Sequence, residues 1–196
     1  MDLPGRVNPG AVTLQQCIDA GVQRVRASDS PCMVVGHSIG AEVALAIAAN
    51  DRSRVAGVVL VGGVVPESGK NFLSTVPFPQ RLFFRLLLSR ARNGIAPPKS
   101  VIRKGYCNDL DEATTELVLS RTVPEVPRLY LDPVQWADIP ADLPRTYVKL
   151  LNDKSVSIKE QERFIERVRA TRVESLDSGH LPMLSRPEEL ARILAD

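Results

Sequence analysis

The sequence predicts an α/β fold in which a parallel sheet is flanked by helices. Residues 32–35 form a short apolar run, helix formers follow to about Asn50, and residues 55–63 form a longer apolar run rich in β-branched side chains. Strand, helix and strand in this order make a βαβ unit, and a continuous apolar run is typical of a parallel strand buried on both faces. Strand and helix patterns alternate again after residue 145. Together these observations favour about four strands.

The other elements follow from local patterns. Residues 1–10 hold two Pro and two Gly, which predicts a loop. Residues 14–26 carry apolar side chains at helical spacing after Thr13, a suitable N-cap. The C-terminal part predicts two strands and two helices, at residues 145–151, 159–170, 172–176 and 187–194 in chain order.

Residues 66–144 differ from the rest of the chain in proline content and in hydrophobic pattern. Ten of the fifteen prolines lie here, and only residues 80–92 and 111–121 have clear helical patterns. A connection of this length is uncommon unless it is functional. We therefore expect a helical cap at residues 66–144, inserted into a core made of residues 1–65 and 145–196. The alternative is a second helical layer of the core that does not contact substrate.

Length, composition and charge exclude several classes of protein. The chain has 196 residues, 44% of them hydrophobic, which suffices for one domain with a core. A net charge of +2 and an aromatic content of 5% argue against a nucleic-acid partner. Residues 1–6 lack a signal-peptide pattern, and no apolar run approaches membrane-spanning length. We therefore expect no membrane partner.

The three cysteines favour a cytoplasmic location. Cys17, Cys32 and Cys107 are odd in number and widely spaced, which fits reduced thiols rather than disulfides. The sequence has no Cys-x-x-Cys pair and no Cys/His cluster, so a metal site is not expected.

The motif Gly36-His37-Ser38-Ile39-Gly40 stands where the first strand meets its helix. This context is that of a nucleophile elbow, in which a strained turn projects a serine hydroxyl beyond the strand end. We expect Gly36 and Gly40 to let the strand and helix backbones pass closely. The backbone N–H of Ile39 and the helix N-terminus would meet a developing negative charge. Ser38 is therefore the candidate nucleophile.

A serine nucleophile needs a base, and the chain has only two histidines. His37 adjoins Ser38 on a sharp turn where neighbouring side chains diverge, so we expect it to pack or to form a hydrogen bond. His180 follows a strand in a loop and is the candidate base. Asp153 follows another strand and gives the order Ser, Asp, His, which makes it the preferred orienting carboxylate. The rival carboxylates are Asp132, Asp138 and Asp177.

These motifs together resemble those of the α/β-hydrolase superfamily. Residues 36–40 are similar to the family's elbow, residues 150–154 to its acid loop, and residues 178–190 to its histidine loop and closing helix. The Asp-Leu-Pro-Gly stretch at residues 2–5 resembles a segment that follows an early strand in the family. The acid and histidine loops look most like the branch of small-ester esterases, plant-type methylesterases and hydroxynitrile lyases.

The resemblance also implies departures from the family. Aligned in this way, the chain begins after the first four family strands, as a gene start set too far downstream would explain. It also lacks the His-Gly loop that completes the family's oxyanion hole, so only the N–H of Ile39 is assigned to that hole. The strand at residues 32–35 would become a sheet edge. Because an exposed apolar edge favours pairing with another chain, we expect self-association there.

The resemblance implies a serine hydrolase that cleaves a carboxylic ester or a related small acyl substrate. Ser38 would attack the carbonyl, His180 would transfer the proton, and Asp153 would orient His180. The N–H of Ile39 would bind the oxyanion, and water would release the acyl-enzyme. No cofactor and no metal are implied. Two alternatives stay open: a lyase of the same fold, and a catalytically impaired fragment or non-enzymatic binding protein.

Overall fold

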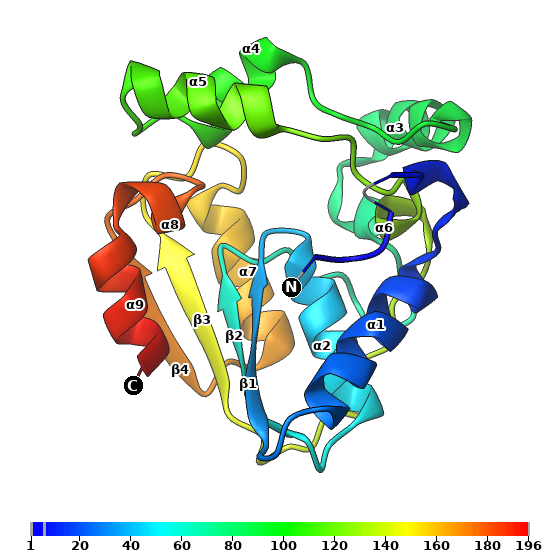
Figure 1. Cartoon of the computed structure of the whole chain (residues 1–196), viewed down its shortest axis with the longest axis vertical. Coiled ribbons are helices and arrows are strands. Elements are labelled where there is room, and N and C mark those ends of the chain that lie inside the picture. Colours follow the sequence, from blue (N-terminus) through cyan, green and yellow to red (C-terminus); the bar gives the residue numbers. More distant parts are fainter. Residues whose placement is uncertain (1, 6, 196) are drawn as a thin grey trace.

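Four parallel strands form the sheet at the centre of the structure (Figure 1). The computed structural model describes residues 2–5 and 7–195 of the chain. Within these residues the strand order is β1-β2-β3-β4, and each neighbouring pair is parallel. The strands are β1 (Cys32–His37), β2 (Val55–Val61), β3 (Arg145–Leu150) and β4 (Arg172–Leu176). The predicted α/β fold is confirmed.

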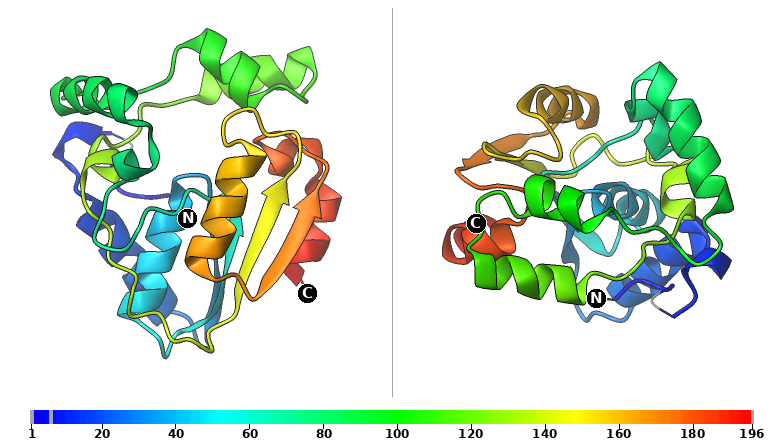
Figure 2. Two further views of the ribbon diagram at one scale, coloured as in Figure 1. Left: turned by 180° about the vertical axis from the view of Figure 1, so that it is seen from behind. Right: turned by 90° about the horizontal axis from the view of Figure 1, so that it is seen from above.

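Helices cover both faces of the sheet (Figure 1, Figure 2). On one face, α1 (Leu14–Arg26), α2 (Gly40–Asn50) and α7 (Ile158–Val168) contribute to the main hydrophobic core. On the other face, α9 (Pro187–Ala195) packs against β2, β3 and β4. Neighbours on β3 show the division, because successive side chains of a strand point to opposite faces. Tyr147 lies in the main core, whereas Val148 packs in the cluster that holds Leu190 of α9.

The helix α1 shows how local sequence sets an element. Thr13 and Gln16 form a capping box: the Thr13 hydroxyl accepts the Gln16 N–H at 3.2 Å, and the Gln16 side chain accepts the Thr13 N–H at 2.9 Å. At the other end, Arg26 pairs with Asp51 at 2.6 Å and joins the C-termini of α1 and α2. The predicted helix and its N-cap are confirmed.

About half of residues 66–144 lies in helices, and parts of this segment lie beyond the carboxyl ends of the strands. Figure 1 shows α4 and α5 above these ends and α3 at the side of the molecule. Its last part, including Val126 and Leu143, packs into the main core, and the division into core and cap stays a prediction. The elements are η2 (Phe72–Thr75), α3 (Phe78–Arg90), α4 (Lys99–Val101), η3 (Ile102–Tyr106), α5 (Glu112–Arg121) and α6 (Arg128–Leu131). Short helices elsewhere are η1 (Pro9–Ala11) and α8 (Pro182–Ser185).

The strand β1 is an edge of the sheet, as expected. Among the residues that the structure describes, it pairs only with β2, with Val35 opposite Val59. Met33 and Val35 are 47% and 49% exposed, so apolar side chains on this strand lack a cover. In residues 2–5 and 7–195, no helix is long and apolar enough to cross a membrane.

Candidate active site

In the parallel sheet, the residues that follow the strands all lie at the carboxyl ends of the strands. Ser38 follows β1, and its N–H donates to the carbonyl of Val61 at the end of β2, at 3.1 Å. The loop after β3 is tied to the loop after β4, since the N–H of Asn152 donates to the carbonyl of Ser178 at 3.0 Å. Residues far apart in sequence therefore meet at the carboxyl ends of the strands, where α/β folds usually place ligands.

Ser38 has the backbone strain expected of an elbow. Its φ is 53°, in the left-handed region that residues other than glycine seldom adopt. Two hydrogen bonds hold this conformation, because the Ser38 carbonyl accepts the N–H of Ala41 at 3.1 Å and of Val64 at 3.0 Å. The turn that precedes α2 is therefore fixed from both the helix and the β2 side.

One of the two expected glycine contacts is present. A Cβ at Gly36 would lie 2.7 Å from the Cα of Ala41, so the strand and the helix do pass closely there. The expectation for Gly40 is wrong, since a Cβ at that position would meet no atom within 4 Å. Gly40 begins α2 and faces open space. The second close approach falls at Gly63, where a Cβ would lie 2.7 Å from that of Ala41.

His180 and Asp153 form a buried pair. The Nδ1 of His180 lies 2.8 Å from Oδ2 of Asp153, and the two side chains are 3% and 0% exposed. Because a carboxylate only accepts hydrogen bonds, Nδ1 carries the proton and Nε2 is left for another partner. The other carboxylate oxygen accepts the N–H of Ser155 at 2.7 Å and of Val156 at 3.0 Å. The buried charge is thus fully hydrogen-bonded.

Gln161 fixes the loop that carries Asp153. This buried side chain lies on α7, accepts the N–H of Leu150 at 2.9 Å, and donates to the carbonyls of Leu150 and Val156, each at 2.9 Å. The Gln161 amide therefore holds the backbone on both sides of Asp153, at Leu150 and at Val156.

The rival carboxylates have other partners or lie on the surface. Asp177 is exposed and accepts the side-chain N–H of Asn152 at 2.6 Å. Asp132 accepts the N–H of Leu14 at 3.2 Å, at the start of α1. Asp138 is exposed. Of the four aspartates considered, Asp153 is the one bonded to His180.

His37 supports His180 rather than competing with it. Its Nε2 lies 2.7 Å from the carbonyl of His180 and must carry a proton to donate to it. The two rings lie 4.9 Å apart. Removal from water and the adjacent His180 lower the pKa of His37 to about 4, so it is neutral at pH 7. The expectation that His37 forms a structural hydrogen bond is confirmed.

The segment at residues 106–109 reaches this site, which the sequence did not predict. The Tyr106 ring lies 4.8 Å from the His180 ring at an interplanar angle of 34°. Asp109 accepts the N–H of Gly179 at 2.6 Å, and Asn108 donates to the carbonyl of Asn152 at 3.0 Å. These polar contacts attach the segment to both the acid and the histidine loops. No local pattern marks these residues, because their partners are more than 40 positions away.

In the part of the chain that the structure describes, no hydrogen bond joins Ser38 to His180. Within the described residues, the Ser38 hydroxyl makes no hydrogen bond, and the N–H of Ile39 has no acceptor. Hydrogen bonds of this kind are often long without substrate and tighten when it binds. The structure thus presents a histidine–aspartate pair and a strained serine at one sheet edge. No group of three or more His, Cys, Asp and Glu side chains suited to a metal occurs in the described part of the chain.

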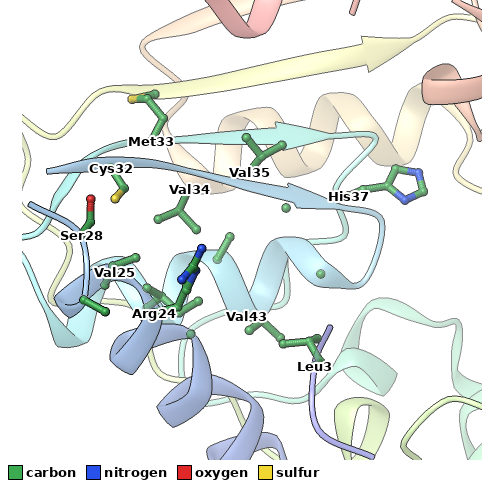
Figure 3. A pocket seen from close by; sticks show the side chains of 16 residues that line it. Leu3, Arg24, Val25, Ser28, Cys32, Met33, Val34, Val35, His37 and Val43 are labelled. Atoms are coloured by element: carbon green, nitrogen blue, oxygen red, sulfur yellow. The ribbon is translucent and has the colours of Figure 1, made fainter. Parts of the chain in front are cut away.

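Two cavities lie near the elbow. A groove of about 590 Å³ follows β1 between that strand and the helices α1 and α2 (Figure 3). Figure 3 shows Val34 and Val35 on opposite faces of the strand and His37 at its end. A second cavity of about 360 Å³ lies between residues 3–5, His37 and residues 123–126. Neither is lined by Ser38 or His180.

Fold and site together define the class of protein. A parallel sheet with a strained serine elbow after one strand, and a carboxylate and a histidine after later strands, is the plan of an α/β hydrolase. The model of the alpha/beta hydrolase family matches residues 1–193. The chain therefore belongs to this family, and the resemblance inferred from the sequence is confirmed.

Solved structures share the fold at low sequence identity. An extracellular alpha/beta-hydrolase from a Paenibacillus species has a TM-score of 0.84 and 18% identity over 95% of this chain and 80% of its own. A methylesterase from Arabidopsis has a TM-score of 0.80 and 17% identity over 100% and 84%. A pyrethroid hydrolase from Sphingobium faniae has a TM-score of 0.75 and 19% identity over 100% and 83%. A comparison with curated proteins found no match.

Proposed function

We propose that this chain hydrolyses a carboxylic ester or a related small acyl substrate through Ser38, His180 and Asp153. The Ser38 Oγ attacks the carbonyl carbon while Nε2 of His180 takes its proton. The C–O bond to the alcohol breaks, and His180 returns the proton to the leaving oxygen. Water then attacks the acyl-enzyme with His180 again as base, which releases the acid and restores Ser38.

The observation that carries this proposal is the buried His180–Asp153 pair, which lies at the carboxyl end of the sheet, as does the strained Ser38. The carboxylate fixes the ring so that Nε2 is free to act on a serine, and it stabilises the cation that forms during transfer. The elbow supports the role of Ser38, since its φ of 53° is costly for a serine and is maintained by two hydrogen bonds.

We assign the oxyanion to the N–H of Ile39. This donor precedes α2, is without an acceptor in the described residues, and adds to the positive end of the helix dipole. Loss of one oxyanion donor typically lowers turnover by about 10²–10³-fold. A site with this single assigned donor is therefore expected to turn over esters slowly.

Three further assignments complete the proposal. Residues 66–144 act as the cap, and the contacts of Tyr106 and Asp109 with the histidine loop support this. An ester substrate is consistent with solved neighbours described as a methylesterase and a pyrethroid hydrolase. A cytoplasmic location rests on three free cysteines, although one neighbour is extracellular.

The first test is covalent labelling with a fluorophosphonate probe. We expect labelling of the 196-residue chain at Ser38 and none in the Ser38→Ala variant. Absence of label at Ser38 in folded protein would contradict the proposal and favour a non-enzymatic binding protein. Product analysis with esters and cyanohydrins separates a hydrolase from a lyase of the same fold.

The second test compares two aspartates near the same loops. Asp153→Asn should lower ester turnover by about 10³–10⁴-fold, because the amide disfavours the required tautomer of His180. Asp177→Asn is the matched control, since this exposed carboxylate bonds to Asn152 instead. Equal losses in the two variants would exclude Asp153 as the orienting carboxylate.

A further inference from the structure

The segment at residues 68–108 is strongly basic. It contains no Asp or Glu and eight cationic side chains, while the whole chain has a net charge of +2, so all other residues together carry −6. Arg103 pairs with Glu112 and Glu116 of α5, whereas Arg81, Arg85 and Arg90 lie on α3, so an anionic partner is favoured at that helix. The cationic residues are Lys70, Arg81, Arg85, Arg90, Arg92, Lys99, Arg103 and Lys104.

The helix α3 within this segment exposes most of its apolar side chains. One residue of the helix, Leu88, is buried, and it anchors the helix to the protein. Single exposed apolar residues are ordinary, but a contiguous group on one helix marks an interaction surface. Six large apolar side chains of the helix are exposed. Five of them, here called the α3 apolar face, are Phe78 (79%), Leu82 (68%), Phe83 (64%), Leu86 (53%) and Leu87 (45%), and the sixth is Phe84 (40%).

Spacing makes this group continuous. Phe78, Leu82 and Leu86 follow at intervals of four, so they share one side of the helix, and Phe83 and Leu87 continue it around the helix. The N-terminal end of α3 is held in place, since the Arg81 guanidinium donates to the carbonyls of Ser74 and Val76. The face is therefore presented by an ordered helix.

The helix lies at the margin of the molecule. Figure 1 shows α3 beside α6, apart from β3 and β4, and the view from above in Figure 2 shows it at the outer side as well. The described residues place no other element over the α3 apolar face, and Arg85 and Arg90 of the same helix are exposed. Apolar and cationic side chains of α3 are therefore both exposed to solvent.

We propose that α3 docks on the surface of an anionic phospholipid bilayer, with its apolar face in the interfacial region. Exposed phenylalanine and leucine side chains beside arginine, without acidic residues, are features that α3 shares with helices that bind at the membrane interface. The convex helix offers apolar groups without a groove, which suits a deformable lipid surface better than a rigid protein partner. The cations add attraction to anionic headgroups.

This proposal revises one sequence expectation and is independent of catalysis. The expectation of no membrane partner rested on the lack of a spanning segment, whereas an interfacial helix of 13 residues need not span the bilayer.

The test is co-sedimentation of the whole chain with phospholipid vesicles. We expect binding to phosphatidylcholine vesicles with about 30% phosphatidylglycerol, at least about tenfold weaker binding to pure phosphatidylcholine, and loss of binding at about 0.5 M NaCl. The Leu82→Glu/Leu86→Glu variant should bind at least about tenfold more weakly, because both changed side chains are exposed and lie on the α3 apolar face. Arg85→Gln/Arg90→Gln should weaken binding and flatten its salt dependence.

The matched control is Leu117→Glu on α5, where a leucine is 48% exposed outside α3. It should bind like the wild type. Circular dichroism shows whether each variant is folded, and the vesicle-composition and salt series of the wild type test the proposal without any variant. Failure of the wild type to bind anionic vesicles would overturn the proposal. So would a wild-type dimer that Leu82→Glu/Leu86→Glu makes monomeric, since a second copy would then occupy the face.

Discussion

Among single residues, the two histidines of the candidate site make different hydrogen bonds. His180 keeps one ring nitrogen bonded to Asp153, while His37 donates to the carbonyl of His180. The low pKa of His37 keeps this donor neutral at pH 7, so in the proposed mechanism no second cation lies beside His180 when that ring takes the proton of Ser38. We therefore expect His37 to position His180 and to lower the stability of the folded protein at acid pH.

The pH dependence of stability follows from His37. Its folded pKa of about 4 lies below its ordinary value of 6.5, so its contribution to stability is full above pH 6.5 and is lost as the pH falls toward 4. His37→Gln, which keeps a donor but does not titrate, should lose on the order of 1–3 kcal/mol less stability than the wild type between pH 7.5 and pH 4. Urea unfolding at both pH values measures this difference. Parallel curves for the two proteins would show that His37 does not set the acid response.

At the scale of elements, the helix α2 carries an unsatisfied acid. Glu42 lies in its first turn, is 0% exposed, and has no hydrogen-bond partner for either carboxylate oxygen within the described residues. Burial, and secondarily the charge of Asp132, raise the pKa of Glu42 well above its ordinary range. The helix dipole favours an acid at this end, but the apolar surroundings disfavour its charge.

Replacement of Glu42 should stabilise the protein. A raised carboxyl pKa means that stability is lost as the pH rises from the ordinary value of 4.5 through the folded pKa. Glu42→Met should gain about 1–3 kcal/mol at pH 8, since an apolar side chain of similar size removes the unsatisfied oxygens. Glu42→Gln removes the titration but keeps a buried polar group, so it should flatten the pH dependence with a smaller gain. Chemical unfolding at pH 5 and pH 8 measures these effects, and a loss of stability in Glu42→Met would show that an unseen partner satisfies the acid.

At the scale of the whole molecule, the sheet has two edges of different character. The β1 edge combines exposed Met33 and Val35 with the groove of about 590 Å³. The β4 edge exposes Val173. Unpaired backbone groups on an edge strand with exposed apolar side chains favour addition of another strand, so we place the predicted self-association at β1.

Lysine substitutions distinguish the two edges. Val35→Lys should weaken self-association at least about tenfold, because a charge on an edge strand opposes pairing. Val173→Lys introduces the same change on β4 and should leave the association unchanged. Sedimentation velocity over a range of concentrations measures both. A wild type that stays monomeric throughout, or an association reduced by Val173→Lys alone, would contradict the assignment to β1.

Much of the fold and the centre of the site were predictable because their signals are local. Alternation, helical spacing and the Thr13 cap predict α1 and the four strands, since these patterns reflect backbone geometry within a few residues. The motif around Ser38 and the order of Asp153 and His180 identify the pair that the structure brings together. Tyr106 and Asp109 were not predictable, because they reach the site through contacts over about 70 positions.

Local patterns in the sequence are enough to predict where strands and helices form and which serine, aspartate and histidine are candidates for chemistry. What covers each apolar face depends on how the elements pack. The same helical spacing that buries Leu14 on α1 leaves Leu82 on α3 in solvent, and the expected close contact moves from Gly40 to Gly63. Periodicity fixes the direction of a side chain within its own element, whereas burial depends on partners that distant parts of the chain supply.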